Sequence, residues 1–149
     1  MYKKKKILVV IPARSGSKGI KNKNIKKINN KPLLSYSIDY AKKCNLVDEI
    51  VVSTESTQYA KIAKKFGAMV PFLRNKKLSG DKIQDYPVVR ECLIKSEKFF
   101  KIKFEYVILL RPTSPFREKK LIERGLKKLH HNKASSSVRS VIKTNCHPF

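Results

Sequence analysis

Short apolar runs alternate along the chain with longer segments in which apolar residues recur every three or four positions. Three of the runs have the length of a buried β-strand: Ile7–Ile11, Glu49–Ser53 and Tyr106–Leu110. Ala68–Leu73 contains a proline, so it is predicted to be a strand near the edge of a sheet. Ser135–Ile142 is predicted as a further strand.

Helical periodicity fills the intervals between these strands. The first predicted helix opens at Lys31–Pro32, because proline is well tolerated in a first turn. Ser53 or Thr54 could cap the second helix, and Gly67 marks its end. The apolar positions that define the four helices are Leu34, Ile38 and Ala41; Tyr59, Ile62, Ala63 and Phe66; Val88, Val89, Cys92, Leu93, Phe99 and Phe100; and Leu121, Ile122, Gly125, Leu126 and Leu129.

The alternation of strands and helices predicts an α/β fold with a parallel sheet covered by helices on both faces. Ligands of such sheets bind beyond the carboxyl ends of the strands. The loops after Ile7–Ile11, Ala68–Leu73 and Tyr106–Leu110 are therefore predicted to lie at the same edge of the sheet. A chain of 149 residues that is 41% hydrophobic fits one domain, residues 1–149.

Composition narrows the cellular setting. No run approaches the roughly 18 apolar residues of a membrane span, and the basic Met1–Lys6 is not followed by a signal peptide. We therefore expect a cytoplasmic protein with no membrane partner. Cys44, Cys92 and Cys146 are odd in number and lack C-x-x-C spacing, which favours reduced thiols over disulfides or a zinc site.

The net charge of +24 would attract any polyanion. A basic nucleic-acid-binding module is therefore an alternative function. The chain has no RNP aromatic motif, KH loop, zinc finger or basic–heptad array, so no specific nucleic acid is expected. Lysine is scattered along every predicted helix, which also fits a general compositional bias.

Small, flexible and basic residues follow the first strand directly. Gly16 and Gly19 would let the backbone close on a bulky ligand, and neighbouring N–H groups can point at phosphate oxygens. Positive charge for a polyphosphate would come from Arg14, Lys18, Lys21 and Lys23. Neither G-x-x-x-x-G-K-[ST] nor G-x-G-x-x-G occurs. The segment predicts a nucleoside triphosphate loop of another kind, with a plain basic surface loop as the alternative.

Several groups of residues stand in a fixed order along the whole chain. They are Ile11–Gly19 (IPARSGSKG) with Lys23–Asn24, Val51–Thr54, Leu73–Arg74 with Leu78–Asp81, Leu109–Arg117 (LLRPTSPFR), and Ser137–Val141 with His147–Phe149. In this order they resemble the motifs of the acylneuraminate cytidylyltransferases, the CMP-sialic acid synthetase family. The resemblance implies a three-layer Rossmann-like nucleotidyltransferase fold with a mainly parallel sheet, truncated at its carboxyl end.

The reaction implied by the resemblance is attack by the anomeric hydroxyl of an acidic nine-carbon sugar on the α-phosphate of CTP, with release of pyrophosphate. The implied catalytic residues, which would hold the triphosphate, are Arg14, Lys18 and Lys23. The implied nucleotide-binding residues are Ala13, Ser15, Gly16, Ser17, Gly19, Asn24, Arg74, Asp81 and Asp85. The implied sugar-binding residues are Arg111, Thr113, Ser114 and Arg117.

Simpler roles stay open for several of these residues. Arg74 could be a solvated strand end, and Asp85 could simply cap its helix, with Pro87 in the first turn. Thr113 and Ser114 could be turn residues between two prolines. Arg117 could pair with Glu118 or face water.

The identity of the sugar is open as well. Many members of the family have glutamine where this chain has Arg111, and an arginine would suit a carboxylate or another anionic substituent. N-acetylneuraminate, pseudaminate, legionaminate and octulosonate are the alternatives. The sequence Ser15–Gly19 favours the acylneuraminate branch over the octulosonate branch.

Family enzymes continue past the position of Phe149, through a dimerisation element and a late pair of aspartates that binds Mg²⁺. The resemblance therefore implies an N-terminal portion of an enzyme that is a homodimer in its full-length form. It also implies Mg²⁺ as cofactor, with its usual ligands outside this chain. We expect the isolated chain to have little or no activity.

Overall fold

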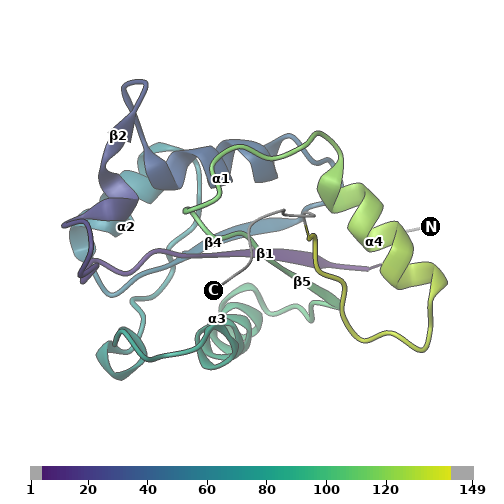
Figure 1. Cartoon of the computed structure of the whole chain (residues 1–149). Helices are drawn as coiled ribbons and strands as arrows, with labels where there is room; N and C mark the ends of the chain where they lie inside the picture. The colour runs from purple at the N-terminus through teal and green to yellow at the C-terminus, as the bar shows by residue number, and fades with distance from the viewer. Residues whose placement is uncertain (1–4, 142–149) are drawn as a thin grey trace. The chain divides into compact units, whose positions relative to one another are not determined.

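The computed structural model describes residues 5–141. Its main sheet contains three parallel strands, β1 (Ile7–Pro12), β4 (Glu49–Ser53) and β5 (Tyr106–Leu109), in the order β4-β1-β5 (Figure 1). In the register, Val9 of β1 lies opposite Ile50 of β4 and Ile108 of β5. The predicted α/β class with a parallel sheet is confirmed.

Two compact units divide the chain, residues 1–117 and 118–149. In the first unit, α1 (Leu33–Lys42) and α2 (Thr57–Lys65) lie on one side of the sheet and α3 (Asp85–Phe100) on the other (Figure 1). Its remaining elements are an antiparallel hairpin, β2 (Lys27–Ile28) with β3 (Lys31–Pro32), and two short 3₁₀ helices, η1 (Lys23–Ile25) and η2 (Lys76–Leu78). The predicted helices on both faces of the sheet are confirmed.

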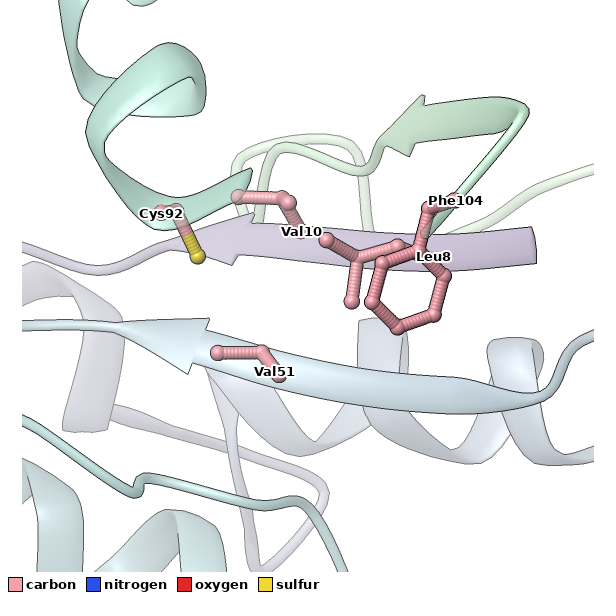
Figure 2. Close-up of a cluster of buried hydrophobic side chains, with 5 residues drawn as sticks. All are labelled: Leu8, Val10, Val51, Cys92 and Phe104. Atoms are coloured by element: carbon pink, nitrogen blue, oxygen red, sulfur yellow. The ribbon is translucent and has the colours of Figure 1, made fainter. Parts of the chain in front are cut away.

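The core is built around β1, whose residues Ile7 to Ile11 are completely buried. Leu8 and Val10, two positions apart and therefore on one face of the strand, pack with Val51, Cys92 and Phe104 (Figure 2). Burial raises the pKa of the Cys92 thiol to about 12, so the thiol stays protonated at neutral pH and behaves as an apolar side chain.

Helix α2 is capped two or three residues later than predicted. Its N-cap is Ser56, whose hydroxyl accepts a hydrogen bond from the Tyr59 N–H at 3.3 Å. Ser53 is still the last residue of β4, and the Thr54 hydroxyl accepts from the Ser56 N–H at 3.2 Å. The prediction of Ser53 or Thr54 as cap was wrong because Ser53 belongs to the sheet and the Thr54 hydroxyl stabilises the turn before the helix.

The predicted strand at Ala68–Leu73 was also wrong. Only Met69 joins the sheet, donating to the Ile50 carbonyl at 2.8 Å and accepting from the Val52 N–H at 3.0 Å. Pro71 has no N–H and cannot donate to a ladder, so the pairing ends at a single bridge.

The start of α3 and part of its buried face differ from prediction. Gln84 is the N-cap, and Asp85 is the first helical residue, with Pro87 in the first turn as predicted. Asp85 therefore does not cap the helix. Val88 and Cys92 are buried as predicted, whereas the Phe99 side chain is exposed.

The second unit is described as far as residue 141 and contains α4 (Leu121–His131), close to the predicted helix. Arg124 on this helix forms an ion pair with Glu118. Residues 135–141 form no strand, so the prediction over Ser135–Ile142 is wrong for this portion. Ile142, Cys146 and the motif His147–Phe149 lie outside the described residues.

Among residues 5–141, no helix combines the length and apolar character that crossing a membrane requires.

Candidate functional site

A cavity of about 190 Å³ opens beyond the carboxyl end of β1 in the first unit. Its lining comes from the end of β1 and the loop after it, from the loop that leads into α3 and the first turn of that helix, and from the loop after β5. Predicted site residues that line it are Arg14, Ser17, Lys23, Asn24, Arg74, Asp81, Asp85, Arg111 and Thr113, and the other lining residues are Pro12, Leu78, Gly80, Ile83, Val88 and Pro112. The sheet edge predicted from strand–loop alternation is thus where these residues meet.

The loop after β1 is anchored at both ends. The buried Ala13 donates its N–H to the Ser53 carbonyl at 2.9 Å, which extends the sheet pairing by one residue. Asn24, 5% exposed, donates from Nδ2 to the Arg14 carbonyl at 3.0 Å. Asn22 adopts the left-handed conformation that turns the chain into η1. Arg14 and Lys23 thereby face the same cavity.

Gly16 and Gly19 are exposed, and a Cβ atom added at either would meet nothing within 4 Å. The packing of the chain itself therefore does not require glycine at these positions. The role predicted for these glycines, to let the backbone approach a ligand closely, stays a prediction.

Asp81 lies opposite the basic residues of this loop. Its carboxylate forms ion pairs with Arg14 at 2.6 Å and Lys18 at 3.0 Å. Hydrogen bonds from Lys18 and from Arg14 hold the pKa of Asp81 below its ordinary value. Two of the three residues predicted to hold the triphosphate thus contact a carboxylate here, although the Lys18 side chain is largely exposed and does not line the cavity.

Arg74 is not a solvated strand end, because only 5% of it is exposed. Its guanidinium donates to the carbonyls of Ser53 and Leu78, while its Nε has no hydrogen-bond partner in the described structure. Burial lowers the pKa of Arg74 below its ordinary value. A buried cation with an unused donor lines the cavity beside the loop predicted to bind the base.

The loop after β5 carries the predicted sugar-binding residues. Arg111 binds the Asp85 carboxylate, with Nε at 2.8 Å, and both side chains line the cavity. Thr113 also lines the cavity, whereas Ser114 is exposed and donates its N–H to the Arg111 carbonyl at 3.2 Å in a turn.

Arg117 does not line this cavity. Its guanidinium donates to the Ser37 hydroxyl at 3.1 Å and the Arg111 carbonyl at 2.6 Å, and it lies over the Tyr40 ring. Burial lowers its pKa. Arg117 therefore connects the loop after β5 to α1. It takes neither of the simpler roles considered from the sequence, which were to face water or to pair with Glu118.

The sequence interpretation missed Glu55. Its Oε1 accepts from both the N–H and the hydroxyl of Ser15 at 2.7 Å, and its Oε2 accepts from the Ser79 hydroxyl at 3.1 Å. Ser15 itself does not line the cavity. The position of Glu55 in the sequence could have indicated its role, since a carboxylate two residues after a parallel strand lies at the edge of the sheet where ligands bind.

The described residues do not fit a magnesium site. They contain no group of three His, Cys, Asp or Glu side chains that could hold a metal ion. The carboxylates that line the cavity, Asp81 and Asp85, are each bound by arginine.

Comparison with known proteins adds the family context. A family model described as cytidylyltransferase matches residues 8–147. A CMP-N,N'-diacetyllegionaminic acid synthase of Campylobacter jejuni is 46% identical over 109 residues, which are 73% of this chain and 46% of that protein. An N-acylneuraminate cytidylyltransferase of Escherichia coli is 36% identical over 140 residues, 94% of this chain and 32% of that protein. The chain therefore spans half or less of these two relatives.

A solved structure shares the fold. It is a CMP:2-keto-3-deoxy-manno-octonic acid synthetase complexed with CTP, with a TM-score of 0.71 over 87% of this chain and 49% of that one. The two sequences are 23% identical, so this likeness concerns the fold alone.

Proposed function

We propose, since this chain belongs to the cytidylyltransferase family, that it transfers CMP from CTP to an acidic nine-carbon sugar and releases pyrophosphate. The observation that carries the proposal is the convergence of three cations on one cavity: Arg14 and Lys23 from the loop after β1, and Arg74 from the loop that leads into α3. A triphosphate with several negative charges needs such a cluster. Family membership favours the transferase over the nucleic-acid-binding module that a net charge of +24 also allowed.

The cavity divides into parts that suit different portions of CTP. Leu78, Ile83 and Val88 would offer apolar surface to the faces of the cytosine ring, and Arg74 lines the same cavity. Arg14 and Lys23 would neutralise the triphosphate. The sugar would enter from the loop after β5, where Arg111 suits its carboxylate.

The reaction needs alignment and charge neutralisation more than covalent help from the protein. The anomeric oxygen forms a bond to the α-phosphorus as the bond from that phosphorus to the pyrophosphate oxygen breaks, and the hydroxyl proton passes to solvent. Arg14 and Lys23 would stabilise the charge that develops on pyrophosphate. Mg²⁺, implied by the resemblance, would be held by residues beyond those described.

The sugar is proposed to be N-acetylneuraminate or a related nonulosonate. The names of the relatives, one acting on N,N'-diacetyllegionaminic acid and one an N-acylneuraminate cytidylyltransferase, support this class. Pseudaminate and octulosonate are the further alternatives. We also propose a homodimer for the full-length protein, and a cytoplasmic location, because CTP is available there.

Titration calorimetry with CTP and ATP tests the nucleotide assignment. We expect CTP to bind at least tenfold more tightly, because the loop that leads into α3 resembles a cytosine-binding loop and a purine presents a larger ring with a different hydrogen-bonding edge. Equal affinities would contradict the assignment of the loop that leads into α3. Pyrophosphate release by the full-length protein, with N-acetylneuraminate, legionaminate and pseudaminate in parallel, would then rank the sugars.

Lys23→Ala is expected to weaken CTP binding by about 1.5–3 kcal/mol, the typical contribution of a hydrogen bond to a charged group. Cytidine binding should be almost unchanged, because it has no phosphates to contact Lys23. Calorimetry with both ligands measures the difference, and Lys61→Ala on the exposed side of α2 is the matched control. Equal losses for CTP and cytidine would place Lys23 away from the phosphates.

A further inference from the structure

One carboxylate joins the two loops that the proposed function assigns to different halves of CTP. Glu55 follows β4 and precedes the N-cap of α2, so its backbone is held by the sheet and the helix. Its Oε1 holds Ser15 in the loop after β1, and its Oε2 holds Ser79 in the loop that leads into α3. Arg14 and Lys18 also link the same loops, through their ion pairs with Asp81 at 2.6 Å and 3.0 Å, and the Arg14 guanidinium lies 3.4 Å from the Ser79 carbonyl oxygen. Glu55 differs from these links because it joins both loops to a third segment, the one between β4 and α2.

The bridge is ionised at neutral pH. Burial by itself would raise the pKa of Glu55, but the hydrogen bonds from the Ser15 N–H and hydroxyl, with the nearby charge of Arg74, lower it below its ordinary value. Hydrogen bonds to an ionised acceptor are shorter and stronger than neutral ones, which agrees with the 2.7 Å distances to Ser15.

Anchoring Ser15 has a direct consequence for its neighbour. Both donors of Ser15 are used by Glu55, so Ser15 is turned away from the cavity that Arg14 lines. Fixing the backbone at Ser15 restricts the directions that the Arg14 side chain can take. In the same way, holding Ser79 fixes the chain next to Gly80 and Asp81, which line the opposite wall.

We propose that Glu55 is a positioning residue that sets the spacing between the phosphate-binding loop and the base-binding loop, and so allows CTP to engage both at once. The inference rests on the proposed function. A ligand that spans two subsites gains affinity from their fixed separation, because binding of one half raises the effective concentration of the other. A ligand that occupies only one subsite gains nothing from that separation.

The test compares three probes on the wild-type chain and on Glu55→Ala: CTP, cytidine and inorganic tripolyphosphate. We expect Glu55→Ala to weaken CTP about 10- to 100-fold, whereas cytidine and tripolyphosphate each change by less than about threefold. A residue with only a structural role would not produce this selective loss, since a loosened fold weakens all three probes together.

Further variants separate the bridge from general effects of substitution. In Glu55→Gln, the amide oxygen can accept from Ser15 and the amide N–H can donate to the Ser79 hydroxyl, so CTP affinity should return to within about threefold of wild type. Ser79→Ala removes one arm of the bridge, and we expect a loss of about threefold to tenfold for CTP alone. This variant keeps the test decisive if Glu55→Ala does not fold. Glu97→Ala is the matched control, because Glu97 also accepts from a backbone N–H, that of Phe104, without lining the cavity.

Parallel weakening of all three probes in Glu55→Ala and Ser79→Ala would overturn the inference. So would wild-type CTP affinity in both variants. If the wild-type chain binds CTP but the variants show either pattern, only the inference fails. Absence of CTP binding by the wild-type chain would overturn the proposed function as well.

Discussion

Arg14→Ala is expected to bind CTP more than about 100-fold less tightly than the wild-type chain, a loss of at least about 3 kcal/mol. The guanidinium can make two charge-assisted hydrogen bonds to phosphate oxygens, and alanine makes none. The substitution also leaves the Asp81 carboxylate with one of its two ion-pair partners, Lys18. Negative charge would then face the triphosphate across the cavity.

The CTP affinity of Arg14→Lys should fall between those of the wild type and Arg14→Ala. Lysine keeps the charge, but a single ammonium cannot reproduce the planar fork of a guanidinium, which can donate to two phosphate oxygens at once. Titration calorimetry measures all three affinities, with Arg90→Ala on the exposed side of α3 as control. Wild-type affinity in Arg14→Ala would show that the triphosphate lies elsewhere.

Leu8→Ala is expected to lower the free energy of unfolding by about 2–5 kcal/mol, the usual range for truncating a fully buried leucine. Leu8 is completely buried in the centre of the sheet, and its cluster contains side chains from β1, β4 and α3 as well as Phe104 (Figure 2). These elements cannot all move inward to fill the cavity, since hydrogen bonds fix β1 on both edges.

Urea unfolding followed by circular dichroism measures this loss. Ile94→Ala, at a position 50% exposed on α3, should change the free energy of unfolding by less than about 0.5 kcal/mol. The folded Leu8→Ala protein should bind CTP as the wild type does, because Leu8 does not line the cavity. A loss below 1 kcal/mol would mean that the cluster repacks.

The strands of the sheet could be predicted because each contains a continuous apolar run, and the predicted bounds of β4 agree with the structure. The hairpin of β2 and β3 was missed because each strand has only two residues. A signal was present in Asn29 and Asn30, which both have positive φ, as a two-residue type I′ turn requires.

Some features of the candidate site could likewise be predicted from the sequence and others could not. Resemblance to family motifs named most of the residues that line the cavity, including Arg74, whose burial no periodicity predicts. The contacts of Glu55 and Asp81 could not be predicted, because each depends on how one loop lies against another. Glu55 also stands next to the cap of α2, where a carboxylate is common for reasons of the helix dipole alone.

The central place of β1 sets an order for folding on the ribosome. This strand pairs with β4, some 40 residues later, and with β5, about 100 residues later. At synthesis rates of about 5–20 residues per second, β1 waits roughly 5–20 s for β5 to emerge. During that interval only β4 can cover one edge of the most apolar segment of the chain. Pairing of β1 with β4 at that stage would leave the other edge of β1 open, and an unpaired strand edge is a template for pairing with another chain.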